Sequence, residues 1–115
     1  MSLEGTWKFT HSYKGIPSYH FFANLGANGS MSVPDFPQFF GIWTQLGPSN
    51  QVALAIADST KPSITSYVGN VGSGNMGGLM TGGSGCPVSK TISGSWFATK
   101  HELIDVPQGA PGLPD

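Results

Sequence analysis

The chain has 115 residues and a formal net charge of −1, and 10% of its residues are charged. This length suits one compact domain, and the weak charge excludes the broad basic surface of a nucleic-acid-binding protein. Glycine (17 residues) and proline (9 residues) are abundant, but 11% aromatic residues argue against disorder, and a single cysteine, Cys86, excludes a disulfide scaffold.

Turn-forming residues recur about every eight to twelve positions, and no long window has the apolar spacing of a helix. The pattern predicts an all-β fold in which about eight antiparallel strands close into a single up-and-down barrel, because closure removes both exposed sheet edges. The strands are expected, in chain order, near residues 5–12, 17–25, 29–33, 39–46, 51–58, 63–71, 75–82 and 91–101. The barrel domain is predicted to span residues 1–103, with a Pro-rich extended tail over 104–115.

One hairpin signal is stronger than the others. Asn28-Gly29 lies between two predicted strands, and both residue types tolerate the positive φ angles of a type I′ turn. The sequence therefore predicts a type I′ hairpin at this position.

The tripeptide Gly-x-Trp occurs three times, as Gly5-Thr6-Trp7, Gly41-Ile42-Trp43 and Gly94-Ser95-Trp96. Residues two apart in a strand share a face, so each glycine leaves room beside its tryptophan. On the first strand Trp7 and Phe9 share the face that we expect to point inward. Because barrel closure makes the first and last strands neighbours, Trp7 and Trp96 are predicted to lie near each other, with a slot beside Gly5 and Gly94.

An opening Gly-x-Trp strand followed by an eight-strand meander resembles the calycin group, the lipocalin-like and avidin-like barrels. The match to small bacterial lipocalin-like domains covers residues 4–100 and is carried by Trp7, Gly15, Phe22, Asn28-Gly29, Gly41-Ile42-Trp43, Tyr67 and Gly94. The resemblance implies a closed barrel that binds a small apolar molecule at its open end, often as an oligomer. The residues after the first tryptophan, Lys8 to His11, depart from the avidin pattern, so biotin binding is not carried over.

Aromatic walls with a few polar groups are typical of small-molecule pockets. The candidate ligand-binding residues are accordingly Trp7, Phe9, His20, Asn24, Trp43, Tyr67 and Trp96. Within this set the inward direction of His20 and Asn24 depends on which face of their strand lines the interior, since they alternate with Tyr19 and Phe21.

The leading function is a non-catalytic domain that binds an apolar or aromatic molecule in the barrel mouth. Two alternatives stay open: a barrel-type cyclase or isomerase in which an interior His or Asp moves a proton, and a structural oligomeric subunit with a filled barrel. No catalytic residue, metal site or cofactor is predicted. The segment Gly72–Gly77 matches a dinucleotide fingerprint, but no helix follows to receive the phosphates.

The cluster of Phe36, Phe39, Phe40 and Ile42 is more apolar than one face of one strand can bury, and such a patch usually marks contact with another chain. A homo-oligomer, a dimer or a tetramer, is therefore expected. No signal peptide is expected in residues 1–12, and the longest apolar run, Val52–Ala57, is too short to span a membrane. The compartment is left open.

Overall fold

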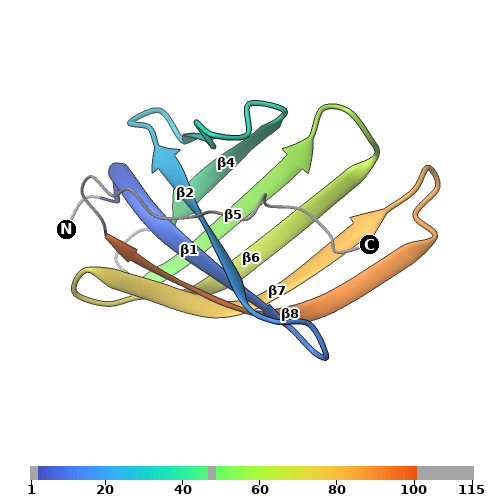
Figure 1. Ribbon diagram of the computed structural model, residues 1–115. Helices are drawn as coiled ribbons and strands as arrows, with labels where there is room; N and C mark the ends of the chain where they lie inside the picture. The colour runs from blue at the N-terminus through green and yellow to red at the C-terminus, as the bar shows by residue number, and fades with distance from the viewer. Residues whose placement is uncertain (1–2, 47–48, 101–115) are drawn as a thin grey trace.

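The computed structural model describes residues 3–46 and 49–100 and shows a closed barrel of antiparallel strands in sequence order (Figure 1). The strands are β1 (Gly5–Tyr13), β2 (Tyr19–Leu25), β3 (Ser30–Ser32), β4 (Phe39–Gln45), β5 (Gln51–Asp58), β6 (Ser63–Val71), β7 (Asn75–Ser84) and β8 (Lys90–Lys100). β1 pairs with β2 on one side and with β8 on the other, which closes the sheet. The all-β, up-and-down barrel is thus confirmed. The predicted tail lies outside the described residues.

The inside of the barrel follows the two-residue period of the strands. On β1 the side chains of Trp7, Phe9, His11 and Tyr13 are buried, and those between them are partly exposed. On β2 the inward face carries Phe21 and its alternate neighbours. His20 and Asn24 consequently point outward, a choice that the sequence left open.

One end of the barrel, which we call the plugged end, lies where β1 begins and β8 ends (Figure 1). Leu3 and Trp7 are 1% and 0% exposed there. The indole Nε1 of Trp7 donates a hydrogen bond of 2.8 Å to the Leu3 carbonyl. The Lys100 ammonium lies 5.3 Å from the centre of the Trp7 ring and donates to the Glu4 carbonyl. Backbone and side chains therefore close this end together.

The opposite end, which we call the tyrosine end, is formed by the β1–β2, β3–β4, β5–β6 and β7–β8 connections. Tyr13, Tyr19 and His11 face the interior near it, with Ile16 and Phe36 packed against the core. Phe39 is also buried. The apolar cluster expected from the sequence is therefore divided, because two of its four members belong to the core.

The β2–β3 hairpin occurs where Asn28-Gly29 predicts it, but the type I′ assignment is wrong. Gly29 adopts a φ of 83°, whereas no non-glycine residue in the described chain has a positive φ. The amide of Gly29 donates to the Gly26 carbonyl at 3.2 Å, and the Gly26 amide donates to the Ser30 carbonyl at 2.8 Å. This is a type I turn closed by a left-handed glycine, so only Gly29 needs the special conformation.

Candidate functional site

A hydrogen-bonded histidine lies inside the tyrosine end of the barrel. His11 on β1 is 0% exposed. Its Nε2 lies 2.7 Å from the hydroxyl of Tyr67 on β6, and its Nδ1 lies 3.2 Å from the hydroxyl of Tyr19 on β2. A neutral imidazole offers one donor and one acceptor, so the two tyrosines satisfy both ring nitrogens. Three strands meet in this cluster.

Every group of this cluster is uncharged at neutral pH, and burial reinforces that state. Desolvation lowers the pKa of His11 to about 3. Desolvation also raises the pKa of Tyr13, of Tyr19 and of Tyr67 above the usual tyrosine value. Tyrosine hydroxyls are protonated at neutral pH in any case, and because burial disfavours whichever form carries charge, it also keeps the imidazole neutral. The site therefore presents neutral donors and acceptors.

One member of the cluster lacks a hydrogen-bond partner. Tyr13 is 3% exposed, and its hydroxyl makes no hydrogen bond of ordinary geometry within residues 3–46 and 49–100. The Thr65 hydroxyl approaches it and opposes part of the rise in its pKa, but a bond of good geometry does not form. An unpaired buried hydroxyl costs stability and calls for an explanation.

Below the tyrosine end the middle of the barrel is filled by stacked rings. The ring centre of Phe9 lies 5.3 Å from that of Phe21 and 5.8 Å from that of Trp96, both in stacked geometry. Tyr67 meets Phe9 edge-on at 6.1 Å. These spacings are those of packed aromatic pairs. The middle of the barrel is therefore occupied by the chain's own side chains.

Trp96 lies where the glycines of two other strands make room for it. It pairs with Gly78 on β7, which in turn pairs with Gly69 on β6. A Cβ atom at Gly78 would lie 2.1 Å from the Val68 carbonyl oxygen, so no side chain fits there. The indole Nε1 donates to the carbonyls of Val68 and Leu79, each at 3.1 Å. Small and large residues thus alternate across strands.

The register of β1 against β8 differs from the expected neighbourhood of Trp7 and Trp96. Trp7 pairs with Lys100, and Trp96 pairs with His11. The space beside Gly94 is also occupied, because a Cβ atom there would lie 2.4 Å from the Ser12 carbonyl oxygen and 3.0 Å from the Tyr13 ring. The expected slot beside Gly94 is therefore filled by the neighbouring backbone and side chains.

The structure brings part of the predicted ligand-binding set together. Trp7, Phe9, Tyr67 and Trp96 are buried in the interior. Trp43 is half-buried and donates from Nε1 to the Gly26 carbonyl at 3.0 Å. His20 and Asn24 lie on the outer face, where His20 stacks edge-on with Phe22 at 6.0 Å and Asn24 accepts a bond of 2.7 Å from Thr6.

Sequence reasoning missed His11, Tyr13 and Tyr19 as site residues. The signal for His11 and Tyr13 was available, because both lie at even spacing from Trp7 on an alternating strand. Tyr19 follows once Phe21 is known to point inward. Their meeting with Tyr67 depends on barrel closure, which a strand pattern alone does not encode.

The chain matches no known protein family, curated protein or solved structure. Within the described ranges no three His, Cys, Asp or Glu side chains gather as a metal site would require. Asp58 serves a turn, since its Oδ1 accepts from the Thr60 amide at 2.8 Å and from the Thr60 hydroxyl at 2.5 Å. No helix in that part of the chain is long and apolar enough to cross a membrane.

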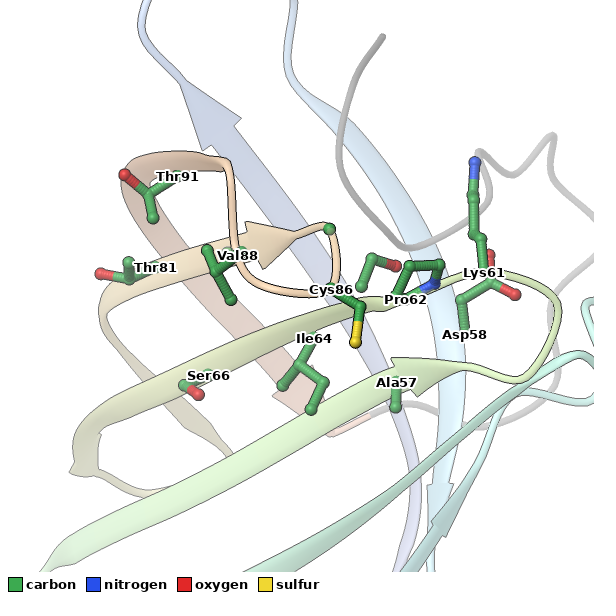
Figure 2. Close-up of a pocket in the computed structure, with 14 residues that line it drawn as sticks. Ala57, Asp58, Lys61, Pro62, Ile64, Ser66, Thr81, Cys86, Val88 and Thr91 are labelled. Carbon is green, nitrogen blue, oxygen red and sulfur yellow. The ribbon is translucent and has the colours of Figure 1, made fainter.

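A second hollow lies outside the barrel (Figure 2). This outer groove, of about 580 Å³, runs over β5, β6 and β7 beneath the β7–β8 loop. In Figure 2, Cys86 and Val88 extend from that loop toward Ile64 and Ala57. The groove is separate from the histidine cluster, because Ile64 and Ala57 point away from the interior.

Proposed function

We propose that the protein is a non-catalytic, calycin-like binding domain that takes a small apolar or aromatic molecule at the tyrosine end. The observation that carries the proposal is the buried Tyr13 hydroxyl without a partner. Buried polar groups are almost always hydrogen-bonded. A ligand that forms a hydrogen bond with this hydroxyl would remove the free-energy cost of burying it unpaired.

The surroundings of Tyr13 define the class of ligand. Its surroundings are apolar or neutral rings: the ring centre of His11 lies 6.0 Å from that of Tyr13, 5.3 Å from that of Tyr19 and 4.9 Å from that of Phe21. Such walls favour a flat apolar body and disfavour a charged one. We therefore propose a ligand with an aromatic or apolar body and one neutral hydrogen-bonding group.

The cyclase or isomerase alternative is less well supported by the same groups. Proton transfer is most efficient when the pKa of the catalytic group lies near the working pH. Burial holds the pKa of His11 at about 3 and that of Tyr67 well above 10. Neither group is poised to exchange a proton with a substrate at neutral pH.

The alternative of a filled structural barrel is favoured by the stack of Phe9, Phe21 and Trp96. It differs from the proposal in what it predicts for Tyr13. In a purely structural barrel the hydroxyl would contribute nothing to binding, since no molecule would enter.

The test compares two probes that differ by one hydroxyl, 1-naphthol and naphthalene, by titration of the full chain. The parent protein is expected to bind 1-naphthol about tenfold more tightly, the value of roughly one hydrogen bond. Tyr13→Phe should abolish this preference. Tyr19→Phe removes a hydroxyl that is already bonded to His11, so it is the matched control and should keep the preference. Failure of both probes to bind, or an equal preference in the parent and Tyr13→Phe, contradicts the proposal.

A further inference from the structure

A large part of the outer surface of the barrel carries no charge. We call the outward side chains of β4, β5, β6 and β7 the charge-free face. β4, β6 and β7 contain no Asp, Glu, Lys, Arg or His, and the one charged residue of β5, Asp58, is its last residue, where its carboxylate accepts hydrogen bonds from Thr60 in the β5–β6 turn. By contrast, the outer face of β1 carries Lys8.

The same face exposes large apolar side chains. Ile42 on β4, Val68 on β6 and Leu79 on β7 are 67%, 58% and 69% exposed. Phe40 and Ile64 are also more than half exposed. Single exposed apolar residues are ordinary, but a contiguous set without charges marks a contact surface.

The relief of the face is complementary to itself. Along β5 the outward residues Ala53 and Ala55 form a trough of small side chains, which continues at Ala57 into the outer groove beneath the β7–β8 loop. The strand pairing places Ile42 opposite Ala55 on one side and Val68 opposite Ala53 on the other. Phe40 and Ile42 of β4 therefore form an apolar ridge on one side of the trough, whereas Ile64 and Val68 border the other side with Ser66 between them. One copy can thus place its β4 ridge in the trough of another.

We propose that the charge-free face is the contact between two copies of this chain, related by a two-fold axis. In such an arrangement each copy supplies one ridge and one trough, as a symmetric interface requires. Four strands of about eight residues cover roughly 500 Å² in plan. Side-chain relief increases this area toward the roughly 800 Å² per partner of a standard interface.

Charge argues for a second copy over the segment 101–115 of the same chain. That segment contains Glu102, Asp105 and Asp115, and covering an apolar face with carboxylates costs desolvation energy. A second charge-free face carries no such cost. The proposal also moves the expected oligomer contact: of the original cluster, Phe40 and Ile42 lie on this face, whereas Phe39 is buried in the core.

Sedimentation velocity of the full chain tests the proposal. One chain has a mass of 12.0 kDa, so the parent should sediment as a species of about twice that mass at about 100 µM. Ala55→Lys places a charge in the trough and should raise the dissociation constant of the dimer at least about a hundredfold. Thr10→Lys, on the outer face of β1 at the opposite side of the barrel, is the matched control and should leave the dimer intact.

A second variant guards against misfolding at Ala55. Ile42→Lys changes a side chain that is already exposed, so the barrel should fold with an unchanged far-ultraviolet circular dichroism spectrum, but it should sediment as a monomer instead of a dimer. A monomeric parent overturns the proposal. The proposal is also overturned if Ala55→Lys and Ile42→Lys both dimerise as well as the parent. It is likewise overturned if the parent is monomeric and dimerises only after residues 101–115 are removed, because that result assigns the face to that segment.

Discussion

At the plugged end the buried Trp7 indole donates to the Leu3 carbonyl, whereas at the tyrosine end the equally buried Tyr13 hydroxyl has no partner in the described chain. Both ends close the same interior with aromatic side chains. At the plugged end the polar atom of Trp7 is paired within the chain. At the tyrosine end the pairing is complete for His11 and incomplete for Tyr13.

The difference indicates that the plugged end serves stability, whereas the tyrosine end keeps a polar group that a ligand could pair. A fully paired, apolar end contributes to stability through burial and packing. A buried polar group without a partner lowers stability, and proteins tend to keep such local conflicts where they function. The comparison therefore supports placing the proposed ligand contact at the tyrosine end.

The largest expected effect comes from breaking the plugged end. Trp7→Ala removes a fully buried indole and should lower the free energy of unfolding by about 3–5 kcal/mol, measured by urea denaturation. Trp43→Ala is the control, because Trp43 also donates to a carbonyl but is only half-buried. The loss of unfolding free energy in Trp43→Ala should be clearly smaller. Equal losses of unfolding free energy in the two variants would show that the plugged end does not contribute more to stability than the half-buried Trp43.

Acid should lower the free energy of unfolding through His11. Unfolded His11 takes up a proton near pH 6.5, but in the fold its pKa is about 3. Protons therefore bind the unfolded state first, and stability is full above pH 6.5 and falls as the pH drops toward 3. Between pH 7 and pH 5 the expected loss is about 2 kcal/mol. In urea denaturation at each pH, His11→Gln should make the free energy of unfolding nearly independent of pH between 7 and 5. If the free energy of unfolding falls equally with pH in the parent and in the variant, His11 is not the group that causes the loss.

The smallest expected effect is a change in unfolding free energy whose sign distinguishes Tyr13 from Tyr19. Tyr13→Phe removes the unpaired hydroxyl and keeps the ring, so the unfolding free energy should rise by up to about 1 kcal/mol. Tyr19→Phe should lower it by a similar amount, because Nδ1 of His11 then loses its partner. Thermal and urea denaturation of the two variants measure this contrast. A loss of stability in Tyr13→Phe would mean that its hydroxyl is paired after all.

Most of the fold could be predicted from the sequence because strand alternation and turn residues are local signals. Every predicted strand overlaps an observed one, and the hairpin at Gly29 occurs where expected. The inward face of β2 could not be predicted, since Tyr19, His20, Phe21 and Phe22 place aromatic rings on both faces. Only the packing of neighbouring strands decides between the two.

The candidate site was less predictable because it depends on register. The pairing of β1 with β8 sets Trp96 opposite His11 and Lys100 opposite Trp7. No residue pattern in either strand specifies that offset, which follows from how the whole sheet tilts as it closes. The bond between His11 and Tyr67 joins residues 56 positions apart, so it too becomes visible only after closure.

The pairing of β1 with β8 also makes the barrel a ring in the topological sense. Each strand has two neighbours, and the order of the strands reads the same from any starting point around the circle. The chain is interrupted between β8 and β1, where the Lys100 side chain reaches the Glu4 carbonyl. The strand numbers therefore follow the order of the chain, whereas closure of the sheet sets the neighbour relations that bring His11 and Tyr67 together.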